Sequence, residues 1–447
     1  MLSPRSRLIW WALLLLVPFA TVAGLLPEAA PFAILLIGTF LVVALLDAAL
    51  AFRSVHGLAI QCAETVRLSK DRASEIELQC TNESPRNRLL YMGIALPREI
   101  ESEQEELLVE IPGGGKLSRV AWKCTPRRRG NYALARCHIE GTSPLGLWGA
   151  RTALPLHSEV RVYPDLLKER KNVAALFLNR GMLGIHAQRQ IGKGRDFEKL
   201  REYIPGDSYE DVHWKATAKR GKPVTKIFQI ERTQEVYVIL DASRLSARQV
   251  SDPADPKRSV STLERFIHSA LVLALAAERQ GDLFGTLTFS DRIEKFVRAR
   301  NGQAHYSLCR DALYALHPKV VTPDYDELFA FIRTNLRRRA LLVFLTALDD
   351  PLSAESFLRN AELVCRQHLL LVNMIQPPGV RPLFTDTNVN RLDDVYRQLG
   401  GHMQWHSLLE LSKKLQNRGV QFSLVQNEKL TAEVVTQYLN VKRRQLV

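Results

Sequence analysis

Two long apolar runs at the start of the chain constrain its structure more than any other feature. They cover residues 8–26 and 32–52, and a Pro-rich segment at 27–31 separates them. Each run is close to the ~20 residues that cross a bilayer as a helix. Proline at both ends of the short separating segment predicts a tight turn. Residues 1–54 therefore predict a transmembrane helical hairpin.

The charges that flank the two runs predict how the hairpin is oriented. Arg5 and Arg7 precede the first run and Arg53 follows the second, so both outer ends should face the cytoplasm. The alternative is a cleaved signal peptide, with a weak cleavage site at 21–23. A second apolar run that follows at once favours the hairpin. We expect a multi-pass protein of the cell inner (cytoplasmic) membrane, with its soluble domains in the cytoplasm and only residues 27–31 outside.

Asp47 is the acidic residue inside the second apolar run. A charge within a membrane span is costly and usually has a partner or a function. Three interpretations stay open: Asp47 faces the other helix, it marks a functional site, or it lies near enough to the end of the span to reach the interface.

Residues 55–164 change to a pattern with a period of two. Ile76, Leu78 and Cys80, for example, alternate with polar neighbours, which indicates half-buried strands. Clusters of Gly, Pro and Asn separate the strands as turns. Several short strands of this kind predict a small β-sandwich. Within it, residues 143–148 predict a turn with a buried Trp.

Residues 165–234 predict a mostly polar connector with a few helical stretches. Its Gly-Lys-Gly at 192–194 lacks the spacing and the trailing Ser/Thr of a Walker A loop, so a tight backbone turn is the better interpretation. Asp207, Asp211 and His213 are a conceivable ligand cluster. One His with scattered acids on a loop more often makes structural polar contacts.

From residue 235 to residue 447, apolar strands alternate with helical patterns. Such alternation predicts a mainly parallel sheet that is covered on both faces, that is, an α/β doubly wound domain. The first strand ends at Asp241, which it should deliver to the sheet edge where α/β proteins bind ligands. The predicted strands are 236–240, 284–289, 341–345, 369–375 and 420–425, and the predicted helices are 262–280, 306–316, 326–336, 354–366, 395–416 and 432–443.

The chain carries a net charge of +14, which attracts anionic lipid or nucleic acid. Its densest runs of arginine, at 127–129 and 337–339, have no nucleic-acid-binding motif or interleaved aromatic residues. A solvated face or attraction to a membrane surface is therefore favoured over nucleic-acid binding.

The cysteines suggest neither a zinc site nor a redox site, because none of the six forms a C-x-x-C pair. Reduced thiols fit a cytosolic location. The six are Cys62, Cys80, Cys124, Cys137, Cys309 and Cys365.

The stretch from residue 192 to residue 243 carries a resemblance to a known family. The positions that carry it are Gly192, Gly194, Phe197, Arg201, Tyr203, Gly206, Asp207 and Trp214. The stretch resembles the signature of the domain-of-unknown-function 58 (DUF 58) family, and the turn at 143–148 matches a family hallmark. The resemblance implies a membrane-anchored protein, often encoded beside a MoxR-type AAA+ ATPase, without established catalytic activity. The chain departs from the family pattern at His213, where an Asp is usual, and at Glu210 and Asp211, where basic residues are usual.

The strand that follows is similar to the first strand of a von Willebrand factor type A domain, which implies a site for a divalent cation. Asp241, Ser243 and Thr322 would match three of its oxygen-bearing positions. Leu245 and Ala347 stand at the two others and have no side-chain oxygen. Magnesium needs hard oxygen ligands, so we expect a degenerate metal-ion-dependent adhesion site (MIDAS) without tightly held metal. Asp241 would then cap or hydrogen-bond the following loop.

The leading functional hypothesis is a membrane-anchored, non-enzymatic adaptor. The resemblance implies that it works with a MoxR-type ATPase on a client complex or on the cell envelope, with the face near Asp241, Thr322 and Asp349 as the contact. One alternative is a basic surface protein that binds anionic lipid or polyanion. The other is a hydrolase that uses Ser243 or His213, although no G-x-S-x-G, H-E-x-x-H or Walker motif supports it. We expect no cofactor and no nucleic acid.

Overall fold

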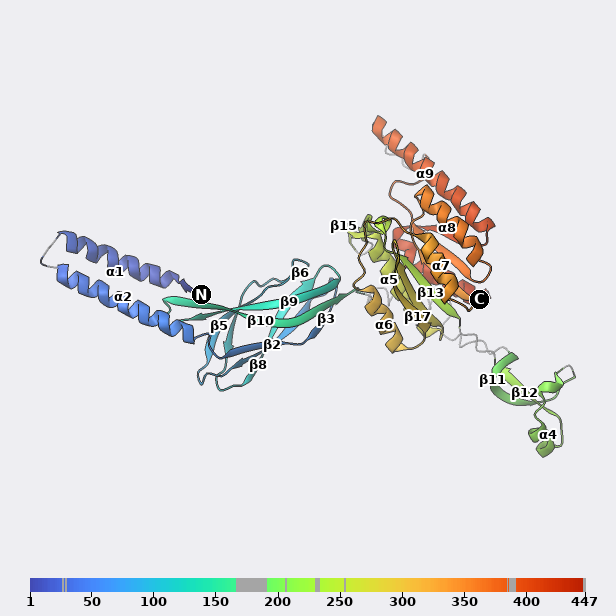
Figure 1. Cartoon of the computed structure of the whole chain (residues 1–447), viewed down its shortest axis with the longest axis horizontal. Coiled ribbons are helices and arrows are strands. Elements are labelled where there is room, and N and C mark those ends of the chain that lie inside the picture. Colours follow the sequence, from blue (N-terminus) through green and yellow to red (C-terminus); the bar gives the residue numbers. More distant parts are fainter. Residues whose placement is uncertain are drawn as a thin grey trace. The chain divides into compact units, whose positions relative to one another are not determined.

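The computed structural model divides the chain into two compact units, Met1–Asp165 and Leu166–Val447. Both are drawn in Figure 1, where many of their helices and strands are labelled. The chain is mixed α/β, with two apolar N-terminal helices and several sheets. The structure describes residues 1–25, 28, 30–165, 191–205, 207–229, 234–252, 255–383, 385 and 391–444.

The predicted hairpin corresponds to two helices, α1 (Ser6–Leu25) and α2 (Ala30–Arg53). Both are long and apolar enough to cross a membrane. No described residue of α1 is buried. Large apolar side chains of α2 are exposed too; Leu35, for example, is 69% exposed. Long helices with exposed apolar surfaces suit lipid better than water. These two helices are the observation that suggests membrane association.

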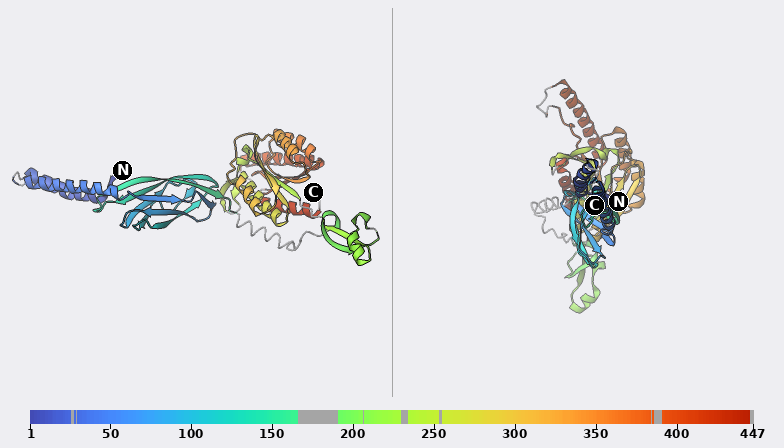
Figure 2. Two further views of the ribbon diagram at one scale, coloured as in Figure 1. Left: turned by 60° about the horizontal axis from the view of Figure 1, so that its bottom comes forward. Right: turned by 90° about the vertical axis from the view of Figure 1, so that its left-hand side faces the viewer.

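Two sheets make up the rest of the first unit, and the two helices leave one end of them (Figure 2). The first sheet has the order β1-β10-β9-β5-β7 with β3 also paired to β10, and the second has the order β2-β4-β8-β6. The strands of the first sheet are β1 (Leu2–Pro4), β3 (Thr65–Ser69), β5 (Arg88–Ile94), β7 (Leu107–Ile111), β9 (Gly130–Thr142) and β10 (Trp148–Tyr163). Those of the second are β2 (Leu58–Cys62), β4 (Ser74–Asn82), β6 (Ile100–Glu101) and β8 (Leu117–Pro126).

The alternating residues of β4 form the centre of this core. Ile76, Leu78 and Cys80 are fully buried, and Trp122 of β8 is 1% exposed. Burying a large apolar side chain contributes about 1.5–3 kcal/mol relative to leaving it exposed. The period-two pattern therefore placed these side chains on the buried face of a sheet, as expected.

The segment predicted to be a polar connector contains a β-hairpin instead. Strands β11 (Ile191–Glu202) and β12 (Val224–Gln229) pair antiparallel, and a short helix, α4 (Trp214–Arg220), lies between them in the chain. The Gly-Lys-Gly at 192–194 lies within β11, where the register shifts, and not in a tight turn. The polar composition of this segment did not predict the strands, because a two-stranded ribbon buries few side chains and needs few apolar residues.

A six-stranded sheet with the order β17-β16-β13-β18-β19-β20 organises the second unit. Its members are β13 (Glu235–Asp241), β16 (Leu283–Phe289), β17 (Ile293–Arg300), β18 (Ala340–Leu345), β19 (Leu369–Ile375) and β20 (Gln421–Val425). All neighbours in it are parallel except β16 and β17. Across all described sheets, however, most pairings are antiparallel. The sequence predicted five of these strands and missed β17, whose mixed charged and apolar residues are typical of an edge strand.

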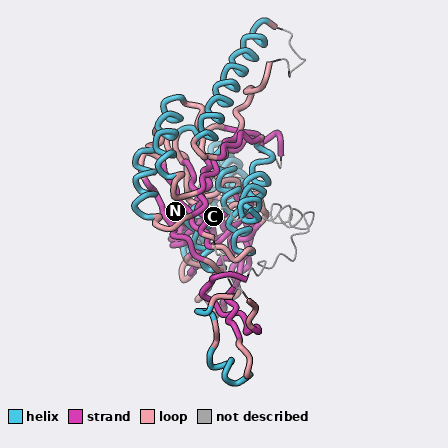
Figure 3. The backbone as a smooth tube through the Cα atoms, turned by 90° about the vertical axis from the view of Figure 1, so that its right-hand side faces the viewer, coloured by secondary structure: helices cyan, strands magenta, loops and turns pink. Residues whose placement is uncertain are grey.

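Helices cover both faces of this sheet (Figure 3). Successive residues of β13 point to opposite faces, so Val238 joins one hydrophobic core and Tyr237 the other. The first core includes α5 (Thr262–Arg279), α6 (Gln303–Leu313) and α10 (Leu430–Arg444). The second includes α7 (Tyr325–Asn335), α8 (Pro351–Val364) and α9 (Leu392–Asn417). Burial on both faces explains why these strands read as continuous apolar runs.

Candidate functional sites at the helix junction and the sheet edge

Asp47 of α2 is buried against the first sheet, with 1% of its surface exposed. Its carboxylate accepts a hydrogen bond from the Ser143 hydroxyl at 2.6 Å and from the backbone N–H groups of Leu145 at 3.0 Å and Leu147 at 3.3 Å. The acid therefore satisfies three donors of the turn at 143–148. Hydrogen bonds to a charged group are the stronger class, so this turn is held firmly to α2.

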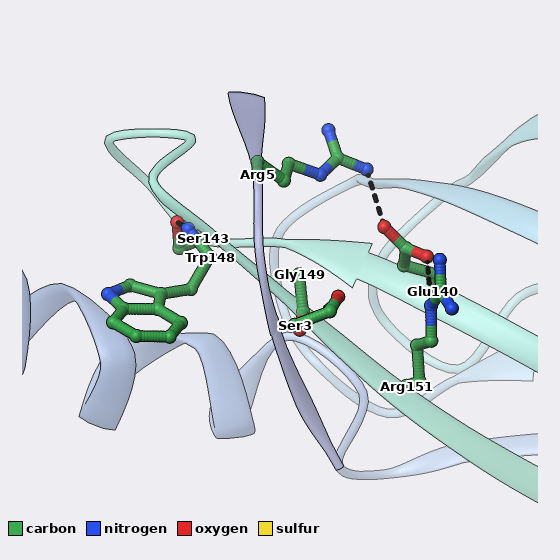
Figure 4. Close-up of polar contacts among 7 residues, drawn as sticks. All are labelled: Ser3, Arg5, Glu140, Ser143, Trp148, Gly149 and Arg151. Carbon is green, nitrogen blue, oxygen red and sulfur yellow. Dashed lines mark hydrogen bonds and ion pairs between the residues drawn. The ribbon is translucent and has the colours of Figure 1, made fainter. Parts of the chain in front are cut away.

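The turn has the local structure that this contact requires. The N–H of Gly146 donates to the Ser143 carbonyl at 3.0 Å, and Gly146 has φ 72°, a left-handed conformation that favours glycine. Trp148 is half-buried, and its indole N–H donates to the backbone carbonyl of Ala44 at 2.8 Å. Figure 4 shows Ser143 and Trp148 beside the helix. The turn expected from sequence is present, and its Trp contacts α2.

The N-terminus is fixed to the same end of the sheet. Strand β1 pairs with β10, and the Met1 amine donates to the Arg151 carbonyl at 2.9 Å. Glu140 bridges Arg5 at 3.0 Å and Arg151 at 2.6 Å (Figure 4). Gly149 permits this approach, since a Cβ there would lie 2.7 Å from a Glu140 carboxylate oxygen.

The environment of Glu140 favours its charged form. Burial by itself raises the pKa of Glu140, but the hydrogen bonds and charges of Arg151 and Arg5 outweigh burial and leave this pKa below its ordinary value. The charge of Glu140 thus helps to hold the start of the chain to β9 and β10.

These contacts join both ends of the α1–α2 pair to one end of the sheets. Sequence reasoning identified Asp47, the turn at 143–148 and the arginines separately. It did not bring them together, because Asp47 and Ser143 are 96 residues apart and no local pattern encodes the contact.

At the second candidate site, Asp241 ends β13 at the carboxyl edge of the C-terminal sheet and is fully buried. Its carboxylate accepts the N–H of Ser243 at 2.8 Å and the hydroxyl of Thr346 at 2.7 Å. The Thr346 hydroxyl is also 2.7 Å from the hydroxyl of Tyr325. Burial raises the pKa of Asp241, although the hydrogen bonds from Ser243 and Thr346 oppose this effect. Burial likewise raises the pKa of Tyr325.

The other positions of the expected metal site lie around this buried network. Ser243 is fully buried, and Leu245 and Ala347 are each 7% exposed. Thr322 is exposed, on a loop whose Val321 carbonyl accepts the N–H of Arg244 at 3.0 Å. Among the described residues, no group of three or more His, Cys, Asp or Glu side chains is arranged to hold a metal ion.

Two residues at this edge have roles that the sequence did not indicate. Thr346 donates to Asp241, in the place that we had assigned to the loop residue Thr322. Asp349, three residues later, forms an ion pair with Arg248. Thr346 follows β18 directly, so its place at the carboxyl end of a neighbouring parallel strand was the available signal.

The family-signature residues make structural contacts in the β11–β12 hairpin. Arg201 donates to both carboxylate oxygens of Asp207, at 2.7 and 2.9 Å. Tyr203 stacks with Tyr209 at a ring-centroid distance of 6.0 Å. The backbone at Gly192, Gly194 and Phe197 lies in β11, whose side chains there are outside the description, and Gly206 lies outside the described residues.

His213 and Asp207, which we considered for a ligand cluster, make local structural contacts. His213 caps the start of α4, where its Nδ1 accepts the N–H of Ala216 at 3.0 Å. Asp207 is paired with Arg201, and Ser243 has no exposed surface. Trp214, one of the family-signature residues, is 69% exposed.

Residues 199–381 match the profile of a family described as "Protein of unknown function DUF58". This match supports the DUF58 family and overlaps the signature quoted above from residue 199 onward. No curated protein matches the chain.

Solved structures give weaker similarities. The ASH / PapD-like domain (PapD-like domain 7) of human CEP192 is 13% identical, covers 25% of this chain and 89% of its own, and has a TM-score of 0.19. WR4, a C. elegans MSP family member, is 10% identical over 23% of this chain and 97% of its own, with a TM-score of 0.16. The E. coli chaperone DraB is 14% identical over 27% of this chain and 60% of its own, with a TM-score of 0.17. These scores are too low to establish a shared fold.

Proposed function

We propose that the chain is a membrane-anchored, non-enzymatic adaptor that works with a MoxR-type AAA+ ATPase in the assembly or maturation of a client protein complex or of the cell envelope. The observation that carries this proposal is the internal hydrogen bonding of Asp241. Its carboxylate stands where α/β sheets bind ligands, yet the protein uses it to fix its own loops. An edge closed in this way suits recognition of a protein by the surrounding surface.

The second unit is, in this proposal, a von Willebrand factor type A-like domain. Numbered along the chain from β13, its sheet has the order 3-2-1-4-5-6, which is an order of doubly wound α/β sheets. Helices on both faces and an antiparallel strand at one edge support the same assignment. The DUF58 match, which covers residues 199–381, includes most of this domain.

Both ends of the α1–α2 pair, in this proposal, face the cytoplasm. The Met1 amine and the end of α2 both contact the sheets of the first unit, so all three lie on one side of a membrane that the helices cross. The positive charges of Arg5, Arg7 and Arg53 at the outer ends of the helices support the cytoplasm as that side. Reporter fusions after Arg53 and at Val447 should be active in the cytoplasm, and a periplasmic signal at either position would contradict this topology.

The partner surface at the sheet edge excludes Asp241, which is fully buried. Thr322 is exposed and Asp350 is partly exposed, whereas the side chain of Asp349 is 3% exposed. Asp350 also caps α8 through Ser353, so its substitution would disturb the helix. Thr322 is therefore the position to test.

The experiment is co-purification of the full chain with the ATPase from native membranes at moderate salt. We expect a stable complex that Thr322→Arg weakens. Failure of the ATPase to co-purify would contradict the adaptor function. Salt-sensitive binding to vesicles of anionic lipid, without ATPase, would favour the alternative of a lipid-surface protein.

A further inference from the structure

A groove of about 760 Å³ lies between α8 and α9 in the second unit. Its floor is apolar, with Ala354 and Leu358 from α8 and Leu408 and Leu411 from α9. A volume of roughly 300–1,000 Å³ is usual for a site that holds a ligand. The groove lies beside Asp241's edge of the sheet but does not include the Asp241 network.

The two helices that form the groove run in the same direction. Gln404 of α9 donates to Asp349, just before α8, at 3.4 Å. At the other end, Arg418, just after α9, donates to the Leu358 carbonyl at 3.0 Å. One end of the groove is therefore marked by the start of α8 and by the carboxyl end of β18.

Asp349 places a buried carboxylate at that end. Its side chain is 3% exposed, and its Oδ2 forms an ion pair with Arg248. Its Oδ1 has no hydrogen-bond partner among the residues that the structure describes. A buried acceptor without a donor is unfavourable, so a ligand that brings an N–H group to Oδ1 would gain from the contact.

The charges around the groove favour a cation at the same end. Arg359 is paired with Asp326 at 3.4 Å and Arg418 with Glu362 at 3.3 Å, so two of the lining cations are already engaged. The charged lining residues are Asp349, Glu355, Glu362 and Glu410 against Arg359, Lys414 and Arg418. Glu362 and Asp349 are themselves paired with Arg418 and Arg248, so the count of acids and bases is balanced. Among the described residues, Glu355 and Lys414 form no ion pair. Glu355 lies near the start of α8, at the Asp349 end, whereas Lys414 lies in the last turn of α9, at the other end.

The N-terminal half of α9 continues the groove with an exposed apolar stripe. This half of the helix projects from the sheet (Figures 1 and 3). Its large apolar side chains recur at helical spacing and are 45–72% exposed: Leu392, Val395, Tyr396, Leu399 and Met403. Met403 lies one turn before Ser407, which lines the groove, so the stripe reaches the rim. A contiguous apolar face of this kind marks a site of protein interaction.

We propose that the groove and the stripe together bind an amphipathic helix of a partner protein. The apolar face of that helix covers the stripe and the groove floor, and a Lys or Arg on it donates to Asp349 Oδ1. This is the helix-in-groove mode of peptide recognition. The inference rests on the adaptor function proposed above, for which it specifies the chemistry of the partner segment.

Two synthetic helical peptides of 18 residues test this proposal against the full chain in uncharged detergent. One is built from Leu and Lys, the other from Leu and Glu, and each carries a photo-cross-linking residue. The net charge of +14 attracts the Leu/Glu peptide, so a preference for the Leu/Lys peptide can come only from local acidic groups. We expect the Leu/Lys peptide to bind at least tenfold more tightly and to cross-link to α8 or α9.

Matched variants locate the effect. Asp349→Asn combined with Glu355→Gln should reduce the affinity for the Leu/Lys peptide at least tenfold. Arg248→Ala breaks the same ion pair but keeps the carboxylate, so it should bind this peptide at least as well as the wild type. Tighter binding of the Leu/Glu peptide, cross-links away from both helices, or an equal loss in both variants would overturn the proposal.

The groove and the adaptor function can fail separately. An ATPase that co-purifies equally well with wild type and with the Asp349→Asn, Glu355→Gln variant would refute the groove as its docking site and leave the adaptor function intact. Binding of the Leu/Lys peptide with the expected variant effects would support the groove even without co-purification.

Discussion

Replacing Asp47 by Ala should release the turn at 143–148 from α2. The substitution removes the acceptor of three hydrogen bonds, from the Ser143 hydroxyl and the N–H groups of Leu145 and Leu147. Hydrogen bonds to charged groups contribute about 1.5–3 kcal/mol each. Because water reaches the opened turn and replaces part of this, we expect a loss of about 3–5 kcal/mol in the free energy of opening the turn.

Amide hydrogen exchange of the full chain measures this loss directly. Exchange through local opening speeds up about tenfold for every 1.4 kcal/mol. The Leu145 and Leu147 amides should therefore exchange roughly 10² to 4 × 10³ times faster in Asp47→Ala. Asp47→Asn keeps one acceptor oxygen and should lie between the two. Leu46→Ala, at a neighbouring position that is 61% exposed, is the matched control and should leave both amides unchanged.

Unchanged exchange of Leu145 and Leu147 in Asp47→Ala would refute this account of the junction. Faster exchange throughout the first unit would instead mean that Asp47 stabilises the fold as a whole. The distinction matters because a local effect identifies the turn as the element that Asp47 holds.

Three further predictions concern charges and metal. For Asp241, a raised pKa means that its contribution to stability is present below the ordinary value of 3.8 and is lost as pH rises through the pKa of the folded state. Asp241→Asn should therefore melt above the wild type by an amount that grows as pH rises from 3.8 through that pKa. Asp241→Ala should melt lower, because Thr346 loses its acceptor. For Glu140, a lowered pKa means that its contribution to stability is present above about pH 4.5 and is lost as pH falls through the folded-state pKa. The difference in melting temperature between wild type and Glu140→Gln should therefore shrink on acidification. A difference that stays constant with pH would contradict the ion pairs of Glu140. Magnesium should not raise the melting temperature of the wild type, whereas a metal present at ~100 times its Kd would add about 2.7 kcal/mol to the free energy of unfolding. The double variant Leu245→Ser, Ala347→Asp should gain a magnesium-dependent rise in melting temperature. A rise in the wild type that Asp241→Ala abolishes would show that the site does bind metal.

The sequence by itself determined the elements whose burial follows a simple period. Two apolar runs of bilayer length gave α1 and α2, period-two alternation gave the core face of β4, and fully apolar runs gave β13, β18 and β19. Each of these patterns depends on the environment of one element, so the order of apolar and polar residues within that segment is enough to predict it. The pattern failed for β11, β12 and β17, where strands at an edge or in a two-stranded ribbon carry charged residues as readily as loops do.

Only the tertiary structure decided which side chains share a site. Asp241 was predicted to reach the sheet edge, but its partner Thr346 comes from another strand, 105 residues further along the chain. Asp47 was recognised as an unusual acid in an apolar helix, and nothing near it in sequence indicates the turn at 143–148. Asp349 was expected on the face that contacts the partner, and the fold pairs it with Arg248 beside the α8–α9 groove. Such contacts depend on how strands and helices are ordered in space, and that order is a property of the whole packed core that no local window of residues contains.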